Sequence, residues 1–240
     1  DPYALPFNTD TRMLFYNKDM FKEAGLDPNK PPATWDELQE YGKKLDVKNG
    51  NKYDRIGYLP NYKMGAEVWM VNADGKSYWD YEKSKTIIND KSNIEALKWF
   101  KDYYDYYGSD VINSFQAEFG EETADPFIGG KLAMTTEQTN FYTKIRDYGE
   151  NINFGIAPLP EKEPGNGQTS WGGGFVAEIP KGAKHPDEAW EFLKYLTDVQ
   201  AQEHWAVKGF DNVANIEASE KAAQNPEFSE DGKMVYEASV

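Results

Sequence analysis

The clearest helical pattern in the chain lies between Ser92 and Gly108. Apolar side chains recur there at the spacing of one helix face, at Ile94, Leu97, Phe100, Tyr103, Tyr104 and Tyr107. This periodicity predicts an amphipathic helix whose apolar face lies in the core. Gly108 is expected to end it, because glycine readily adopts the conformations found just after helices.

Elsewhere, short apolar runs alternate with helical patterns. The runs, which we interpret as strands, lie at 11–16, 56–59, 132–135 and 153–158. The helical patterns lie at 20–24, 34–45, 121–128, 140–148, 186–196, 199–207 and 216–223. Strands that alternate with helices indicate an α/β fold with a largely parallel sheet.

Local signals mark the starts of several of these helices. Asn17 is placed to cap the helix that carries Phe21, and Thr34 to Glu37 has the capping-box sequence. Pro186 opens the helix at 186–196, which is expected to point four apolar residues inward, namely Ala189, Phe192, Leu193 and Leu196.

The most unusual stretch is Trp171 followed by Gly172, Gly173 and Gly174, after which an alternating run continues to Ile179. Glycine lacks a Cβ atom and lets another group approach the backbone closely. We therefore expect a ligand to lie against the indole of Trp171 and the amides of the three glycines. The alternative is a buried tryptophan beside an irregular strand start.

Composition excludes several classes of function. The net charge of −15 argues against nucleic acid, whose phosphates need Lys and Arg to neutralise them. The chain has no cysteine, so disulfides, thiolate metal sites and cysteine nucleophiles are excluded. No apolar run is long enough to span a membrane. The first residues do not resemble a signal peptide, which suggests that the beginning is a cut.

No catalytic or metal motif stands out. The two histidines, His185 and His204, are too few and too far from other ligands for a metal site or a triad. Carboxylates are plentiful, but no two of them are marked as an acid and base pair for glycoside hydrolysis. We expect no metal, no cofactor and no catalytic residue, and a catalytic function is unsupported.

Several segments, taken in order, resemble bacterial ABC-transporter solute-binding proteins of the sugar-type family 1, the group that includes the maltose-binding protein. They are TRMLFYNKDMFKEAGL at 11–26, PPATWDEL at 31–38, FIGGKLAM at 127–134, GIAPLP at 155–160, and WGGGF at 171–175 with PDEAWEFLKYL at 186–196. The likeness covers nearly the whole chain, and the order of the segments is more specific than any one of them.

The resemblance implies a periplasmic-binding-protein-like (type II) fold with two α/β lobes, a mixed sheet flanked by helices, and solute held between the lobes. The chain would be an internal fragment with an incomplete second lobe. Its implied parts are the C-terminal lobe at 9–170, a hinge crossing at 171–175, an N-terminal-lobe segment at 176–226 and a return toward the C-terminal lobe at 227–240. The implied partners are a carbohydrate and the membrane permease of an importer. The implied location is extracytoplasmic, either periplasmic or lipid-anchored, and a monomer is expected.

Sugars bind to flat aromatic faces flanked by a few planar polar groups. Trp171 is the first choice for such a face, with Gly172 and Gly173 beside it. Trp69, with Glu67, is the second, and a core position is equally open for Trp69. The remaining candidates are Gln138, Asn140, Tyr142 and Arg12, and a salt bridge is an equally open role for Arg12. Many relatives carry a tryptophan near the position of Asn140, and this chain has Phe141 and Tyr142 instead.

Three alternatives stay open. The protein could bind a non-sugar solute, such as a polyamine or glycerol phosphate, although the latter would favour a basic cluster that the chain lacks. It could be a carbohydrate hydrolase, which would cleave glycosidic bonds. A purely structural role is the third alternative.

Overall fold

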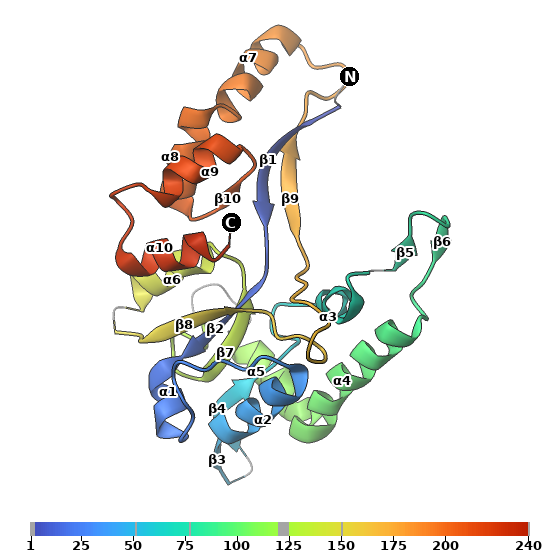
Figure 1. Ribbon diagram of the computed structural model, residues 1–240, viewed down its shortest axis with the longest axis vertical. Coiled ribbons are helices and arrows are strands. Elements are labelled where there is room, and N and C mark those ends of the chain that lie inside the picture. The colour runs from blue at the N-terminus through green and yellow to red at the C-terminus, as the bar shows by residue number, and fades with distance from the viewer. Residues whose placement is uncertain (1–2, 51, 77, 120–124, 150, 240) are drawn as a thin grey trace. The chain divides into compact units, whose positions relative to one another are not determined.

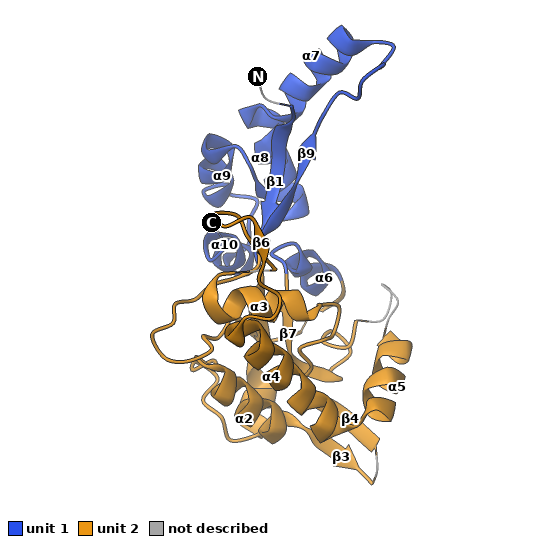
Figure 2. Ribbon diagram, turned by 90° about the vertical axis from the view of Figure 1, so that its right-hand side faces the viewer, with its two compact units in different colours: residues 1–11, 138–147, 172–240 blue, residues 12–137, 148–171 orange. Residues whose placement is uncertain are grey.

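The computed structural model describes residues 3–50, 52–76, 78–119, 125–149 and 151–239 (Figure 1). The chain divides into two compact units, which Figure 2 shows in different colours. Unit 1 contains residues 1–11, 138–147 and 172–240, and unit 2 contains residues 12–137 and 148–171. The backbone therefore passes from one unit to the other several times.

Unit 2 is built on a five-stranded mixed sheet. Its strands follow the order β3 (Val47–Asn49), β4 (Lys52–Tyr58), β7 (Leu132–Glu137), β2 (Met13–Asn17) and β8 (Phe154–Pro158). The expected α/β fold with a mixed sheet flanked by helices is confirmed. The sheet is not largely parallel, however, because β4 and β7 are parallel whereas the other described pairs are antiparallel.

Strand β2 explains this difference. Two consecutive strands that are joined by a crossover helix form a parallel pair only when they lie side by side in the sheet. The neighbours of β2 are β7 and β8, which come from distant parts of the chain, and β2 is antiparallel to both. The chain between β7 and β8 belongs largely to unit 1, so these two strands do not form a simple crossover unit.

Helices flank the sheet of unit 2, and a short hairpin lies between two of them in the chain. They are α1 (Lys18–Glu23), α2 (Trp35–Leu45), α3 (Ala66–Asp74), α4 (Lys91–Tyr107), α5 (Ser109–Phe119), and the hairpin strands β5 (Trp79–Asp80) and β6 (Lys85–Thr86). The predicted caps are present. The side chain of Asn17 accepts hydrogen bonds from two amides of the first turn of α1. The hydroxyl of Thr34 accepts one from the amide of Glu37 at 3.2 Å.

Helix α4 turns a different face to the core from the one that its periodicity predicts. Tyr103 and Tyr107 are buried as predicted, but Ile94 and Leu97 are exposed. Trp99 occupies the inner face instead, and its ring centroid lies 4.5 Å from that of Trp35 and 4.7 Å from that of Trp69. Burying this large ring against two others outweighs the burial of two aliphatic side chains, so the helix is rotated. None of the described helices is both long and apolar enough to span a membrane.

Unit 1 contains a three-stranded antiparallel sheet and a group of helices. The strands follow the order β10 (Asn212–Val213), β1 (Leu5–Asp10) and β9 (Gly173–Ala177). The helices are α6 (Phe141–Tyr148, in this unit up to residue 147), α7 (Pro186–Leu196), α8 (Val199–Gly209), α9 (Ile216–Ala223) and α10 (Glu230–Glu237).

A chain of aromatic contacts explains which segments unit 1 includes. The ring of Phe210 lies 4.6 Å from that of Tyr142 and 4.7 Å from that of Phe228, which in turn lies 5.3 Å from Tyr236. Residues 138–147 and 227–240 therefore group with unit 1, although the lobes implied by the family resemblance assign them elsewhere. That assignment of lobes stays a prediction.

The helix expected at 121–128 lies partly outside the described residues. From Asp125 to Gly130 the chain forms turns, and the Asp125 carboxylate accepts a hydrogen bond from the amide of Phe127 at 2.9 Å.

Candidate functional site

Trp171, the first candidate, stands at the end of unit 2 with its ring half-buried. One part of the side chain packs against the core of the unit. The guanidinium carbon of Arg12 lies 5.0 Å from the centroid of the indole ring, within the range of a cation–π interaction. Arg12 is itself buried. The structure thus brings together two of the predicted binding residues, a flat aromatic ring and a planar hydrogen-bond donor.

Two polar side chains, the buried Asn72 and the half-buried Ser170, fix the backbone that carries Trp171. The hydroxyl of Ser170 accepts a hydrogen bond from the amide of Arg12 at 2.9 Å and donates one to the Arg12 carbonyl at 2.8 Å. The amide group of Asn72 donates to the carbonyl of Thr169 at 2.6 Å, and its oxygen accepts from the indole of Trp35 at 2.6 Å. The indole is therefore positioned before any solute arrives, which reduces the entropy lost on binding.

The three glycines after Trp171 lie against β1. A Cβ atom on Gly174 would lie 2.3 Å from the carbonyl oxygen of Asn8, and the φ angle of 151° also requires glycine. The amide of Gly173 donates to the carboxylate of Asp10 at 2.9 Å. The need for a glycine at position 174 is therefore explained by the close packing of β9 against β1. The amide of Gly173, which was expected to face a ligand, already has a hydrogen-bond partner within unit 1.

Trp69 is a core residue. Its side chain is fully buried, and its indole N–H donates to the carbonyl of Pro60 at 3.2 Å. Of the two interpretations of Trp69, the core position is therefore the one that the structure shows, and the ring has no open face for a sugar. Glu67 lies in the first turn of α3. Its carboxylate lies against Gly65, because a Cβ atom on Gly65 would be 2.0 Å from a carboxylate oxygen of Glu67. Burial, and then the negative charge of Glu67, raise the pKa of Tyr78.

The third group of candidates lies in unit 1. Gln138 and Asn140 are half-buried, and their side-chain amides donate to the carboxylates of Asp10 at 2.8 Å and Asp211 at 3.0 Å. Tyr142 is buried, and its hydroxyl lies 2.7 Å from that of Ser229. The two amides have the chemistry to contact a polyol, whereas the ring of Tyr142 belongs to the core of the unit.

Residues 1–235 of the chain match the family described as bacterial extracellular solute-binding protein. The chain belongs to this family.

Several proteins of known structure or function are similar to this solute-binding protein. The mannobiose-bound structure of CpMnBP1 is 33% identical in sequence, with a TM-score of 0.85. The similarity covers 99% of the present chain and 61% of that chain. The arabinooligosaccharide-binding protein of Bacillus subtilis (strain 168) is 26% identical over 220 residues, which is 87% of this chain and 48% of that protein. The sn-glycerol-3-phosphate-binding periplasmic protein UgpB of Escherichia coli (strain K12) is 29% identical over 162 residues, 65% of this chain and 35% of that protein. The chain thus spans less than half the length of these two curated relatives. The two curated relatives are described as binding proteins and the CpMnBP1 structure as having mannobiose bound, and the family implies an extracytoplasmic location.

The structure of this solute-binding protein also contains a polar cluster that its sequence did not reveal. In unit 1, the carboxylate of Asp211 accepts hydrogen bonds from Asn140, from the indole N–H of Trp205 at 2.8 Å and from Asn8 at 3.5 Å. Trp205 is partly exposed, so an aromatic face again lies beside planar polar groups. With 41 acidic residues in the chain, nothing in the sequence distinguishes Asp211 from the others.

Among the residues that the structure describes, no group of three His, Asp or Glu side chains could hold a metal ion. The pattern of planar amides, carboxylates and indoles is suited to holding hydroxyl groups by hydrogen bonds.

Proposed function

We propose that this protein is the solute-binding component of an ABC importer and that it binds a carbohydrate, preferably an oligosaccharide. The observation that carries the proposal is the half-buried indole of Trp171 beside the guanidinium of Arg12, on a backbone fixed by Asn72 and Ser170. A sugar has an apolar C–H face and a rim of hydroxyls, and such a pair matches both.

The charges of the candidate residues favour a neutral solute. Among the proposed binding residues Arg12 is the one cation and Glu67 the one anion, and the chain as a whole carries a net charge of −15. A phosphate dianion would be better held by several cationic donors. Relatives described as bound to mannobiose or as binding arabinooligosaccharides support a carbohydrate, and the likeness to a glycerol-3-phosphate-binding protein supports the alternative.

The transport cycle that we propose makes and breaks no covalent bond. The solute would stabilise a closed form through its higher affinity for that form, and the permease would recognise the closed form. The protein would act as a monomer outside the cytoplasm, either in a periplasm or attached by a lipid to the outer face of the membrane. The expected position of the solute between two lobes stays a prediction.

Calorimetric titration of the 240-residue chain, and of the full gene product, tests the proposal. The ligands are mannobiose, an arabinooligosaccharide, maltotriose and glycerol 3-phosphate. We expect one of the sugars to bind, and Trp171→Ala to raise its Kd about 5- to 150-fold, the equivalent of ~1–3 kcal/mol of lost burial. Trp79→Ala, which removes a partly exposed indole from the hairpin of unit 2, is the matched control.

Three results would count against the proposal. Binding of glycerol 3-phosphate without any sugar would favour the alternative solute. Release of new reducing ends from labelled oligosaccharides would favour a hydrolase. Equal affinity of the Trp171→Ala and Trp79→Ala variants would exclude the indole of Trp171 from the binding site.

A further inference from the structure

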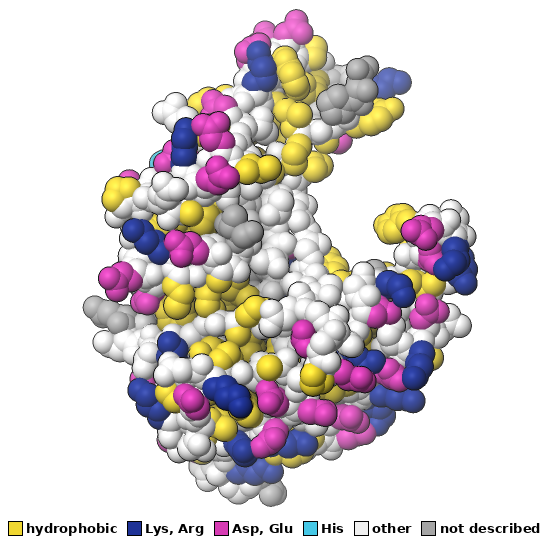
Figure 3. Space-filling view, viewed as in Figure 1, with side chains coloured by type: hydrophobic (Ala, Val, Ile, Leu, Met, Phe, Trp, Pro, Cys, Tyr) yellow, Lys and Arg dark blue, Asp and Glu magenta, His cyan; other side chains and the backbone are white. Residues whose placement is uncertain are grey.

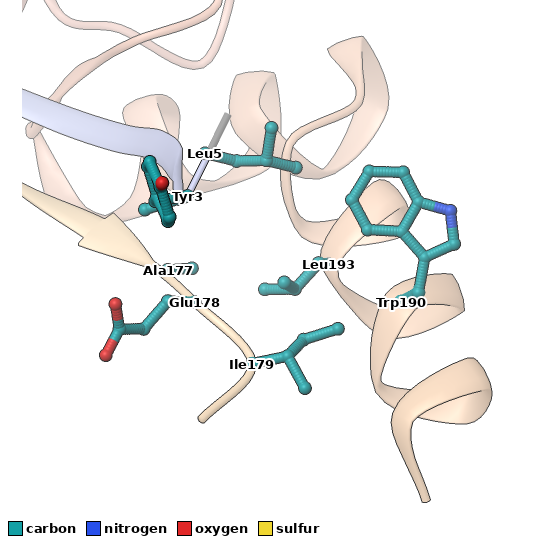
Figure 4. A pocket seen from close by; sticks show the side chains of 8 residues that line it. Tyr3, Leu5, Ala177, Glu178, Ile179, Trp190 and Leu193 are labelled. Atoms are coloured by element: carbon teal, nitrogen blue, oxygen red, sulfur yellow. The ribbon is translucent and has the colours of Figure 1, made fainter. Parts of the chain in front are cut away.

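An open cavity of about 240 Å³ lies in unit 1 between α7 and the ends of β1 and β9 (Figure 4). Its lining is largely apolar, with Leu5, Ile179 and Leu193 among its residues, and it contains neither asparagine nor glutamine. Side chains with a reactivity of their own lie instead in unit 2, in two Asn–Gly sequences, Asn49–Gly50 and Asn166–Gly167.

An Asn–Gly sequence can modify itself. The backbone nitrogen of the glycine attacks the side-chain carbonyl carbon, Cγ, of the asparagine. The new N–C bond closes a five-membered succinimide ring, the bond between Cγ and Nδ2 breaks, and ammonia leaves with the proton of the amide. Water then opens the ring to give aspartate or isoaspartate. Glycine favours the attack because it has no Cβ atom to crowd its nitrogen.

The two sequences are equally accessible but lie in different elements. All four residues are exposed. Asn49 ends strand β3, and Gly50 follows it in the turn that leads to β4. Asn166 and Gly167 lie in the loop between β8 and β9. Exposure therefore does not distinguish them, and the difference must come from the groups around each glycine amide.

At the second sequence the attacking nitrogen is already engaged. The amide of Gly167 donates a hydrogen bond to one carboxylate oxygen of Glu161 at 3.1 Å, and the amide of Gly165 donates to the other at 2.7 Å. The backbone of Glu161 is itself fixed by two hydrogen bonds of 2.9 Å, to Ala33 and Trp35. The amide must lose its proton before the attack, and the nearby carboxylate opposes the negative charge that results.

The first sequence has no such restraint within the described part of the chain. The side chain of Asn49 forms no hydrogen bond there, and the amide of Gly50 donates to no described side chain. A Cβ atom on Gly50 would meet no atom within 4 Å, so the space around this residue is open. The asparagine side chain is therefore free to turn toward the glycine nitrogen.

The position of β3 favours the reaction further. This strand has three residues, stands at the end of its sheet and pairs with β4, so it opens locally at small cost. Lys48 precedes Asn49, and Lys52 is opposite it in the hairpin. Lys and Arg side chains are exposed at this end of unit 2 in Figure 3. Their positive charge favours loss of the amide proton, whereas Glu161 has the opposite effect on Gly167.

We propose that Asn49 is a site of spontaneous modification in the folded protein, converted through a succinimide to aspartate and isoaspartate, and that Glu161 protects Asn166 from the same reaction. Each conversion adds one negative charge to a chain whose net charge is −15. Isoaspartate also adds one carbon to the main chain, which disturbs the pairing of Asn49 with Lys52. The inference does not depend on the identity of the solute.

Peptide mapping by mass spectrometry provides the first test. The folded 240-residue chain and the same chain in guanidinium chloride are incubated in mildly alkaline buffer, and conversion at each asparagine is followed with time. In the denatured chain both sequences should convert at similar rates. In the folded chain Asn49 should convert at nearly the denatured rate. Asn166 should be slower by about 10- to 150-fold, the equivalent of breaking a hydrogen bond to a charged group worth ~1.5–3 kcal/mol.

A pair of variants provides the second test. Glu161→Ala removes the acceptor of the Gly167 amide and should speed conversion of Asn166 by about tenfold or more. Glu163→Ala removes an exposed carboxylate from the same loop and is the matched control, which should leave the rate unchanged. Circular dichroism shows whether each variant is folded, and conversion of Asn49 should be equal in both.

The proposal is overturned if Asn49 and Asn166 convert at equal rates in the folded chain, or if folding slows Asn49 as strongly as Asn166. It is also overturned if a folded Glu161→Ala variant converts Asn166 no faster than Glu163→Ala does. Rapid conversion at Asn49, slow conversion at Asn166 and acceleration of the latter in Glu161→Ala support it. The comparison of folded and denatured chains applies even if a variant fails to fold.

Discussion

Replacement of Asn72 by alanine tests how firmly unit 2 holds the candidate site. Asn72 is almost completely buried, and its side chain joins the indole of Trp35 to the carbonyl of Thr169 through two hydrogen bonds of 2.6 Å. Its removal leaves the buried indole N–H of Trp35 and the part-buried carbonyl of Thr169 without these partners, at about 1–3 kcal/mol each. We therefore expect Asn72→Ala to destabilise the protein by about 2–6 kcal/mol, which corresponds to a Tm lower by roughly 4–24 °C.

The same variant should weaken binding of a solute. Without Asn72 the backbone at Thr169 is held less firmly, so Trp171 is less well positioned before binding. Thermal unfolding followed by circular dichroism gives the stability, and calorimetry below the Tm gives the affinity. Asn29→Ala, at an exposed position, is the control and should change stability by less than about 0.5 kcal/mol. A Tm for Asn72→Ala equal to that of the control would refute the role assigned to these two hydrogen bonds.

Two further predictions concern the fold of each unit. Gly174→Ala should destabilise the protein by at least ~1 kcal/mol more than Gly165→Ala does. Both glycines have positive φ, but only at Gly174 would a Cβ atom lie 2.3 Å from a carbonyl oxygen. Equal Tm values for the two variants would show that β1 and β9 move apart without loss of stability. Burial raises the pKa of Asp46 above its ordinary value of 3.8, so this group contributes stability that is present below the unfolded pKa and is lost as the pH rises through the folded pKa. The stability of Asp46→Asn relative to the unmodified protein should therefore increase as the pH rises above about 4, as measured by urea unfolding at several pH values, and a flat difference would contradict the assignment.

Local signals were the part of the fold that the sequence predicted best. Asn17 and Thr34 cap their helices with hydrogen bonds to amides two or three residues ahead, so the relevant contacts lie within one short segment. The prediction that Ile94 of α4 lies in the core was wrong, because the buried face of this helix is set by contacts of Trp99 with Trp35 and Trp69, which are distant in sequence. Periodicity records which residues are apolar, and it does not rank one large ring against two aliphatic side chains.

The candidate site was predictable to a smaller extent. Trp171 and Arg12 do lie together in the structure, and both were chosen because aromatic and guanidinium groups suit a sugar. Trp69 was chosen for the same chemistry and is buried, because residue type alone does not tell an indole in a core from an indole in a binding site. The sequence did not single out Asp10 and Asp211, because the amides that donate to their carboxylates come from distant positions in the chain.

The junction between Trp171 and Gly172 combines these features. Residues 169–171 are fixed to unit 2 through Asn72 and Ser170, whereas Gly173 is fixed to β1 of unit 1 through Asp10. Gly172 joins these two segments, and it is itself close to β1, because a Cβ atom on it would lie 3.1 Å from the carbonyl oxygen of Asp10. The hydrogen bonds that position the indole all lie within unit 2, so they do not depend on the contacts that the glycines make in unit 1.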